Sequence, residues 1–221
     1  NQIPNGRYQV DPTTGFYKVN PNNPVVGNRE PEFIGGINNT VRYKKFILSL
    51  LLDVRKGGDV FNGTEYFLVT RGLSKKTLLN DRQSVTVTGV NSVTGADFTQ
   101  TYNANQSYTI GSTTYAGTAM IQNYWANYAS NSMNFITSVN WLKVRSLSLT
   151  YDFTSMLKNQ KIIKGISATA VGTNLFTWTN YKGMDPEVSA AGGTGGSGST
   201  GIDYLGVPAV ASFTFGVNVT F

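Results

Sequence analysis

Residues 212–221 read SFTFGVNVTF, and every second side chain in this stretch is apolar. Consecutive side chains of an extended chain point to opposite faces, so the apolar residues share one face and the polar residues the other. The apolar series is Phe213, Phe215, Val217, Val219 and Phe221. The stretch therefore predicts a β-strand that separates two different environments.

Two other segments show the same alternation. In residues 46–56 the apolar side chains are Phe46, Leu48, Leu50, Leu52 and Val54, and the opposite face includes Ser49, Asp53 and Arg55. In residues 145–153 the apolar side chains are Leu147, Leu149, Tyr151 and Phe153. Two less regular strands are expected at 33–42 and 166–178, where glycines favour bulges.

The composition excludes several classes of site. The chain has no histidine and no cysteine, which removes zinc or iron–sulfur sites built on those ligands and any Ser-His or Cys-His catalytic pair. The net charge is +6, but the basic residues are scattered, so we expect no nucleic-acid partner. We expect no enzymatic activity, no catalytic residue, no metal and no cofactor.

The lengths of the connections form a second pattern. We expect a loop at 1–32, a strand pair at 33–56, a long loop at 57–141, a strand pair at 142–178, a loop at 179–211 and a last strand at 212–221. Short turns join the members of each strand pair, and long loops join the pairs. Short turns on one side and long loops on the other are typical of an outer-membrane β-barrel, with the long loops extracellular.

Alternation alone also fits other folds. A soluble or surface-attached β-sandwich that serves as a carbohydrate-binding or adhesion module would alternate in the same way. A small closed barrel would need further strands between residues 80 and 135, where 84–88 and 109–115 are the only faint candidates. Dependence on detergent would separate a membrane protein from a sandwich.

Several ordered motifs carry a family resemblance. They are PEFIGGINNT (31–40), Tyr43-Lys44, DVRKGGDVFN (53–62), NLFTW (174–178), DPE (185–187) and FTFGVNVTF (213–221). In this order and spacing they resemble the late barrel strands of SusC/RagA-type TonB-dependent transporters. The resemblance runs from about residue 6 to 221 and is weakest between 80 and 135.

The resemblance implies an all-β fold. The chain would supply about five antiparallel transmembrane strands, the C-terminal portion of an outer-membrane barrel of about 22 strands. Five strands cannot close, because the smallest membrane barrels have about eight and an open edge in lipid leaves backbone groups unpaired. We therefore expect the remainder of the barrel to accompany this C-terminal segment.

The resemblance also implies a function and partners. The whole protein would import glycan or peptide oligomers across the bacterial outer membrane, with a SusD-like lipoprotein as an external lid. Energy would come from the TonB complex through a plug that is not in this chain. Outer-membrane lipid and the barrel assembly machinery would be the remaining partners.

The predicted site residues fall into four groups. Lipid-facing residues are Phe46, Leu48, Leu50, Leu52, Leu147, Leu149, Phe213, Phe215, Val217 and Val219. Interfacial aromatic residues are Tyr151, Phe153, Trp178 and Tyr181. Candidates for contact with the lumen, a ligand or a partner are Asp53, Arg55, Asp59, Asp185 and Glu187. Phe221, as a terminal aromatic, resembles the assembly signal of outer-membrane proteins.

Some alternatives stay open at this point. Asp185 and Glu187 could shape a turn, meet a partner or, with Asp203, hold calcium. Asp53, Arg55 and Asp59 could form a salt bridge inside the barrel or touch substrate. Tyr124, Trp125 and Tyr128 could pack the long loop against itself or stack on sugar rings. Residues 196–201 match a nucleotide-binding glycine pattern, but no helix follows them, and we expect a flexible loop.

Overall fold

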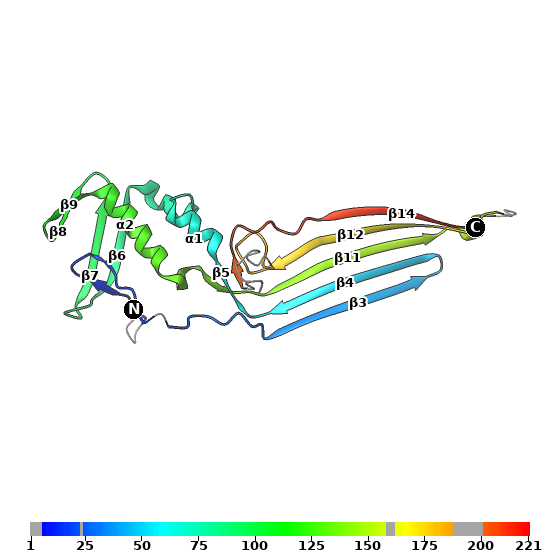
Figure 1. Ribbon diagram of the computed structural model, residues 1–221, viewed down its shortest axis with the longest axis horizontal. Helices are drawn as coiled ribbons and strands as arrows, with labels where there is room; N and C mark the ends of the chain where they lie inside the picture. The colour runs from blue at the N-terminus through cyan, green and yellow to red at the C-terminus, as the bar shows by residue number, and fades with distance from the viewer. Residues whose placement is uncertain (1–5, 23, 158–161, 188–200) are drawn as a thin grey trace, which may run out of the picture. The chain divides into compact units, whose positions relative to one another are not determined.

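Five antiparallel strands form the sheet labelled β3, β4, β11, β12 and β14 in Figure 1. They are β3 (Phe33–Tyr43), β4 (Phe46–Lys56), β11 (Trp141–Asp152), β12 (Gly165–Thr179) and β14 (Ser212–Thr220), in the spatial order β14-β12-β11-β4-β3. A two-residue turn, Lys44-Lys45, joins β3 to β4. The predicted all-β class with about five antiparallel strands is confirmed.

The computed structural model describes residues 6–22, 24–157, 162–187 and 201–221. The chain divides into two units, which are described separately. Unit 1 comprises residues 1–27 and 61–136, and unit 2 comprises residues 28–60 and 137–221. The five-stranded sheet belongs to unit 2.

The register of the sheet brings the apolar series of different strands together. Leu50 lies opposite Leu147, and Leu48 lies opposite Leu149. On the other side of β12, Ala170 lies opposite Phe215 and Ala168 opposite Val217. Because paired residues point to the same face, the apolar side chains of β4, β11, β12 and β14 share one surface, and on β3 Ile37 and Val41 join it on either side of Asn39.

A β-bulge interrupts strand β11 at Arg145. The register shifts between Val144 and Ser146 against both neighbouring strands. An extra residue on one strand reverses the alternation beyond it. Leu142 and Val144 therefore share the apolar face with Leu147 although their numbers are even.

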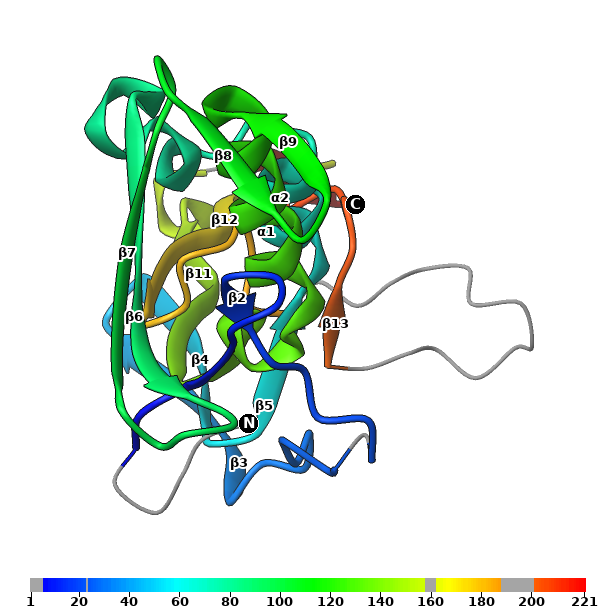
Figure 2. The ribbon, with the colours of Figure 1, turned by 90° about the vertical axis from the view of Figure 1, so that its left-hand side faces the viewer.

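Unit 1 contains most of the chain's helical structure. Its helices are α1 (Gly63–Thr70), η1 (Lys75–Arg82), α2 (Gly117–Ser130) and η2 (Ser132–Phe135). Strands β1 (Gln9–Asp11), β2 (Phe16–Tyr17), β6 (Ser84–Asn91) and β7 (Asp97–Asn103) form a sheet in the order β2-β1-β6-β7. Strands β8 (Ser107–Ile110) and β9 (Thr113–Ala116) form a hairpin; Figure 2 shows it together with the longer β6–β7 hairpin.

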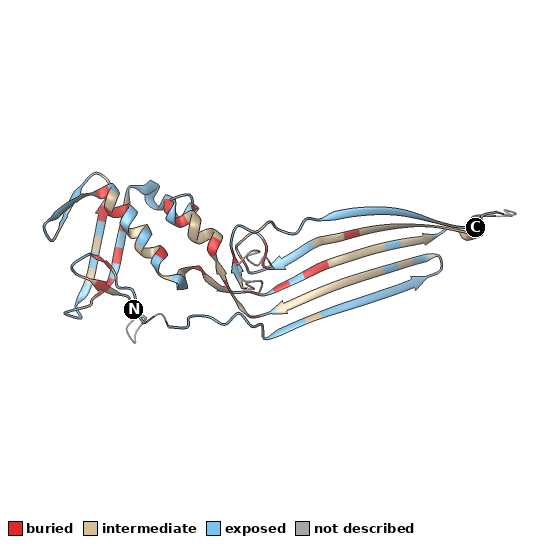
Figure 3. Cartoon of the chain, in the orientation of Figure 1, coloured by how far each residue is buried: buried red, intermediate tan, exposed pale blue. Residues whose placement is uncertain are grey.

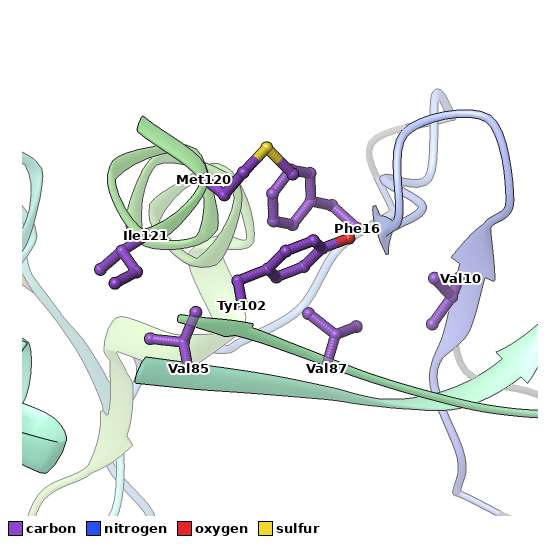
Figure 4. Close-up of a cluster of buried hydrophobic side chains, with 7 residues drawn as sticks. All are labelled: Val10, Phe16, Val85, Val87, Tyr102, Met120 and Ile121. Carbon is purple, nitrogen blue, oxygen red and sulfur yellow. The ribbon is translucent and has the colours of Figure 1, made fainter. Parts of the chain in front are cut away.

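The core of unit 1 forms between α2 and the β2-β1-β6-β7 sheet. Figure 4 shows Met120 and Ile121 of α2 above Val85 and Val87 of β6, with the rings of Phe16 and Tyr102 between them. A second cluster contains Val69, Ala129 and Phe135. The long loop expected at 57–141 therefore contains a folded unit with its own buried residues.

Three short strands and one short helix complete the described structure. Strands β10 (Ile136–Ser138), β5 (Asp59–Asn62) and β13 (Ile202–Asp203) pair in the order β10-β5-β13. The helix η3 (Thr154–Met156) follows β11. Within the described ranges, no helix has the length and apolar character needed to cross a bilayer.

Candidate functional site

The apolar face of the five-stranded sheet is exposed. The strands in Figure 3 are coloured mainly as exposed or intermediate along most of their length. Phe213, Phe215 and Val217 keep 70%, 80% and 69% of their surface accessible. Phe46, Leu48 and Leu149 are also exposed, and Leu50, Leu52, Leu147 and Val219 are partly buried. A β-sandwich would cover this face, so the exposure argues against the sandwich alternative.

Aromatic rings lie at both ends of this face. At the β3–β4 turn, the ring of Tyr151 contacts the rings of Phe46 and Phe153, with centroids 4.6 and 4.5 Å apart. At the opposite end, Phe176 and Trp178 stack with centroids 5.9 Å apart, and both are exposed. Rings at the two borders of an apolar band are typical of the girdles of membrane barrels.

The distance between the two aromatic ends matches a bilayer. Trp178 lies opposite Leu142, and Phe46 lies opposite Tyr151. The path along β11 from Leu142 to Tyr151 covers roughly 30 Å at the usual rise per residue. Strands in membrane barrels tilt, so this path corresponds to an apolar band about 25 Å tall.

The other face of the sheet is polar. Hydroxyl pairs join neighbouring strands: Thr40 with Ser49 at 3.0 Å, Thr150 with Thr169 at 2.8 Å, and Thr173 with Ser212 at 2.6 Å. Such cross-strand pairs stabilise a sheet and suit a wet surface.

A cluster of five charged side chains lies on this polar face. It consists of Asp53, Lys143, Arg145, Asp185 and Glu187, and we call it the ion cluster. The Lys143 ammonium donates to Asp185 at 2.8 Å and to Glu187 at 2.6 Å. The Arg145 guanidinium donates to Asp53 at 2.7 Å and also to Glu187. Glu187 therefore accepts from both cations.

Strand alternation explains why β11 can supply two neighbouring cations. Lys143 lies opposite Asp53, and Arg145 is two positions further along, so both side chains reach the polar face. Arg145 is also the residue at the bulge, and Ser146, opposite Leu51, follows it on the same face.

Lys143 and Asp185 are both nearly inaccessible. The side chain of Lys143 is 4% exposed and that of Asp185 is 8% exposed. Asp185 also accepts hydrogen bonds from the backbone N–H groups of Glu187 at 3.0 Å and Ala209 at 3.1 Å. Burial acts to raise the pKa of Asp185, but the hydrogen bonds from Lys143 and these two N–H groups outweigh it and lower the pKa. Asp185 is therefore ionised at neutral pH.

The indole of Trp141 packs beside the two cations. The ring centroid lies 5.6 Å from the Lys143 ammonium and 5.5 Å from the Arg145 guanidinium. Trp141 is buried with Val60, Val139 and Tyr181. The indole is therefore part of the core of unit 2, and the electron-rich face of its ring contacts the two cations.

Tyr181 does not lie among the interfacial aromatic rings. Its side chain is 6% exposed, and its hydroxyl donates to Asp203 at 2.6 Å. Burial and this hydrogen bond raise the pKa of Tyr181, so its hydroxyl stays neutral. The sequence placed Tyr181 at the interface because it follows Trp178, but the chain turns inward after β12 ends at Thr179. The interfacial assignment of Tyr181 is not supported.

The remaining predicted polar residues fasten backbone segments. The Arg55 guanidinium donates to the carbonyl oxygens of Gly57 at 3.0 Å and Arg29 at 3.2 Å. Asp59 accepts from the backbone N–H of Asn28 at 2.8 Å. Of the predicted polar residues, the structure thus brings Asp53, Asp185 and Glu187 together. The sequence analysis missed Lys143 and Arg145.

The structure offers no support for the calcium alternative. Oxygens of Asp185 and Glu187 bind Lys143 and Arg145, and Asp203 accepts from Tyr181. Among the residues that the structure describes, no group of three or more acidic side chains is placed to hold a metal ion. Residues 196–201, expected to form a flexible loop, lie outside the described residues.

A single antiparallel sheet with one exposed apolar face and one polar face is the arrangement found in the wall of a membrane β-barrel. Comparison with known proteins agrees with this class. The chain is 24% identical to TonB-dependent receptor P3 and 23% identical to TonB-dependent receptor P39, both of Formosa agariphila (strain DSM 15362). Each alignment covers 89% of the chain, and the chain spans only 17% of the length of either relative.

A solved structure has a similar fold. It is the RagAB peptide importer in the "open-open" state, with a TM-score of 0.53 and 22% sequence identity over 87% of this chain and 17% of that one. No protein-family model matches the chain. The similarity to the two TonB-dependent receptors and to the RagAB structure confirms the predicted resemblance to SusC/RagA-type TonB-dependent transporters.

Proposed function

We propose that the five-stranded sheet is part of the barrel wall of a TonB-dependent transporter in the bacterial outer membrane. The observation that carries this proposal is the exposed apolar face, bordered by aromatic rings at a spacing that suits a bilayer. The similarity to TonB-dependent receptors and to a peptide importer supports it. On this proposal the apolar face meets lipid and the polar face meets the lumen.

The whole protein would take up glycan or peptide oligomers, with a SusD-like lipoprotein as its lid. TonB would supply energy through a plug outside this chain, and the chain itself would perform no chemistry on the cargo. The similarity to the RagAB peptide importer supports an importing role. On this proposal the transporter lies in the bacterial outer membrane.

The ion cluster has a structural role in this proposal. It ties the segment after β12 to β11 through Asp185 and Glu187, and it holds the returning chain through the N–H of Ala209. We propose that it fixes the base of an extracellular loop at the mouth of the barrel. Both ends of this loop, at Asp185 and at Ala209, would then stay in fixed positions during import.

The proposed orientation can be tested by cysteine labelling. The chain has no cysteine, so a single introduced thiol reports one position. Ser112, in the β8–β9 turn of unit 1, is expected to be extracellular, and Lys45, in the β3–β4 turn, periplasmic. In intact cells a membrane-impermeant maleimide should label Ser112→Cys but label Lys45→Cys only after the outer membrane is opened.

The reverse labelling pattern would contradict the orientation. Equal labelling of both variants in intact cells would contradict the membrane-spanning assignment itself. Labelling of both variants after permeabilisation confirms that each thiol is reactive.

Phe221 is proposed to act as an assembly signal as well as a wall residue. It is 71% exposed on the apolar side of the last strand. Phe221→Ala is expected to reduce the amount inserted in the outer membrane far more than it reduces the stability of the refolded protein. The measurement pairs outer-membrane abundance with stability in detergent, and Val219→Ala is the control. If abundance follows stability in both variants, Phe221 is a wall residue only.

A further inference from the structure

Unit 1 contains a cavity that the barrel wall does not explain. Its volume is about 660 Å³, within the range of roughly 300–1,000 Å³ typical of small-molecule sites. Residues between 8 and 26 form one side, and residues between 124 and 134, from α2 and η2, form the other. All of the lining residues that the structure describes belong to unit 1.

The lining is rich in aromatic rings and in uncharged polar groups. Tyr8, Tyr17, Tyr124 and Tyr128 are among the lining residues, as are four asparagines and two serines: Asn20, Asn127, Asn131, Asn134, Ser130 and Ser132. Among the lining residues that the structure describes, Lys18 is the one charged residue and none carries a carboxylate. Burial raises the pKa of Tyr124 to about 12, so its hydroxyl is neutral and can both donate and accept a hydrogen bond.

The wall residues are held in place by their own contacts. The Asn127 side chain accepts from the Tyr17 N–H at 3.1 Å and donates to the Tyr17 carbonyl at 2.9 Å. The rings of Tyr8 and Tyr17 contact each other with centroids 5.0 Å apart. The Asn134 amide donates to the Tyr128 carbonyl at 2.7 Å. A preformed wall lowers the entropy cost of binding.

The chemistry of this lining favours sugar over peptide. A pyranose ring has apolar C–H faces, which suit phenol rings, and hydroxyl groups at its edge, which suit amides and hydroxyls. The ammonium terminus or a basic side chain of a peptide would find no carboxylate among the described lining residues. We propose that this cavity binds a neutral oligosaccharide segment. That the bound sugar is cargo rests on the proposed import function, whereas the binding itself does not.

The test is direct binding by the purified full-length protein in detergent. The probes are pools of neutral oligosaccharides of four to eight units from glucan, mannan, galactan and xylan, and a pool of short peptides. Saturation-transfer NMR identifies a binding pool, and calorimetry then gives the dissociation constant. We expect at least one sugar pool to bind.

Three variants locate the binding. Tyr8→Ala removes a ring from the wall while keeping the backbone, and should weaken binding about tenfold. Ser132→Trp places a bulky side chain at the cavity from an exposed position and should abolish binding. Ser112→Trp adds the same bulk at an exposed turn of unit 1 that does not line the cavity, and should bind as the unmodified protein does.

The outcomes separate this inference from the proposed function. Binding of peptides alone, binding of no pool, or full binding by Ser132→Trp would overturn the sugar site, even if TonB-dependent uptake continues. Sugar binding that is lost in Ser132→Trp, in a protein that supports no uptake, would uphold the site and contradict import instead.

Discussion

Replacing Leu50 with arginine is expected to destabilise the folded protein in lipid by about 2–4 kcal/mol, the cost of a cation near the midplane of the bilayer on the lipid face of a barrel. Leu50 lies near the middle of β4, opposite Leu147 and Asn39. It is therefore far from the aromatic rings at either end of the apolar face. An arginine there has little chance to reach the water at either border.

The matched variant is Ser49→Arg, one position along the same strand. Ser49 lies on the polar face, where its hydroxyl pairs with that of Thr40. Ser49→Arg should lower the free energy of unfolding by much less than Leu50→Arg does. It removes one hydroxyl pair, and the new arginine on the lumen side keeps its charge in water. Unfolding in lipid vesicles measures both variants. Equal destabilisation would refute the assignment of faces.

The five-stranded sheet could be predicted because strand alternation is a local property. A side-chain period of two fixes which residues share a face before any partner is known. The sequence alone therefore predicted that Phe213, Phe215 and Val217 share one face. The bulge at Arg145 could not be found this way, because it depends on pairing with β4 and β12. Leu142 and Val144 consequently went unassigned.

The ion cluster could not be predicted from the sequence either. Asp185 and Glu187 were candidates because they flank Pro186 in a loop, but nothing local joins them to Lys143, which lies 42 and 44 positions earlier. The folded core of unit 1 was missed for a similar reason. Its apolar residues are spread between Val10 and Ile121 and form one cluster only after β1, β6 and α2 come together.

Lys143→Met is expected to produce the largest loss, about 3–5 kcal/mol, because it removes one partner of a buried ion pair and leaves the other charged. Asp185 would keep the N–H groups of Glu187 and Ala209 but lose its only cation among the contacts described above. Methionine has a similar length, so the loss reflects the charge more than the packing. Arg145→Met is the matched variant: that side chain is 27% exposed, and water would partly replace it, so its loss should be smaller.

A local measurement shows whether this loss falls on the loop base. Lys182 is exposed and lies between Tyr181 and Asp185, so trypsin cleavage after Lys182 on intact cells reports opening of this segment. Cleavage should be much faster in Lys143→Met than in the unmodified protein. Lys143→Met combined with Asp185→Leu should recover part of the stability, because no buried charge then lacks its partner. If the double variant is as unstable as the sum of the two single variants, Lys143 and Asp185 are not energetically coupled. The segment after β12 would then be held by other contacts, such as those of Glu187 with Arg145 and the burial of Tyr181, and not by the Lys143–Asp185 pair.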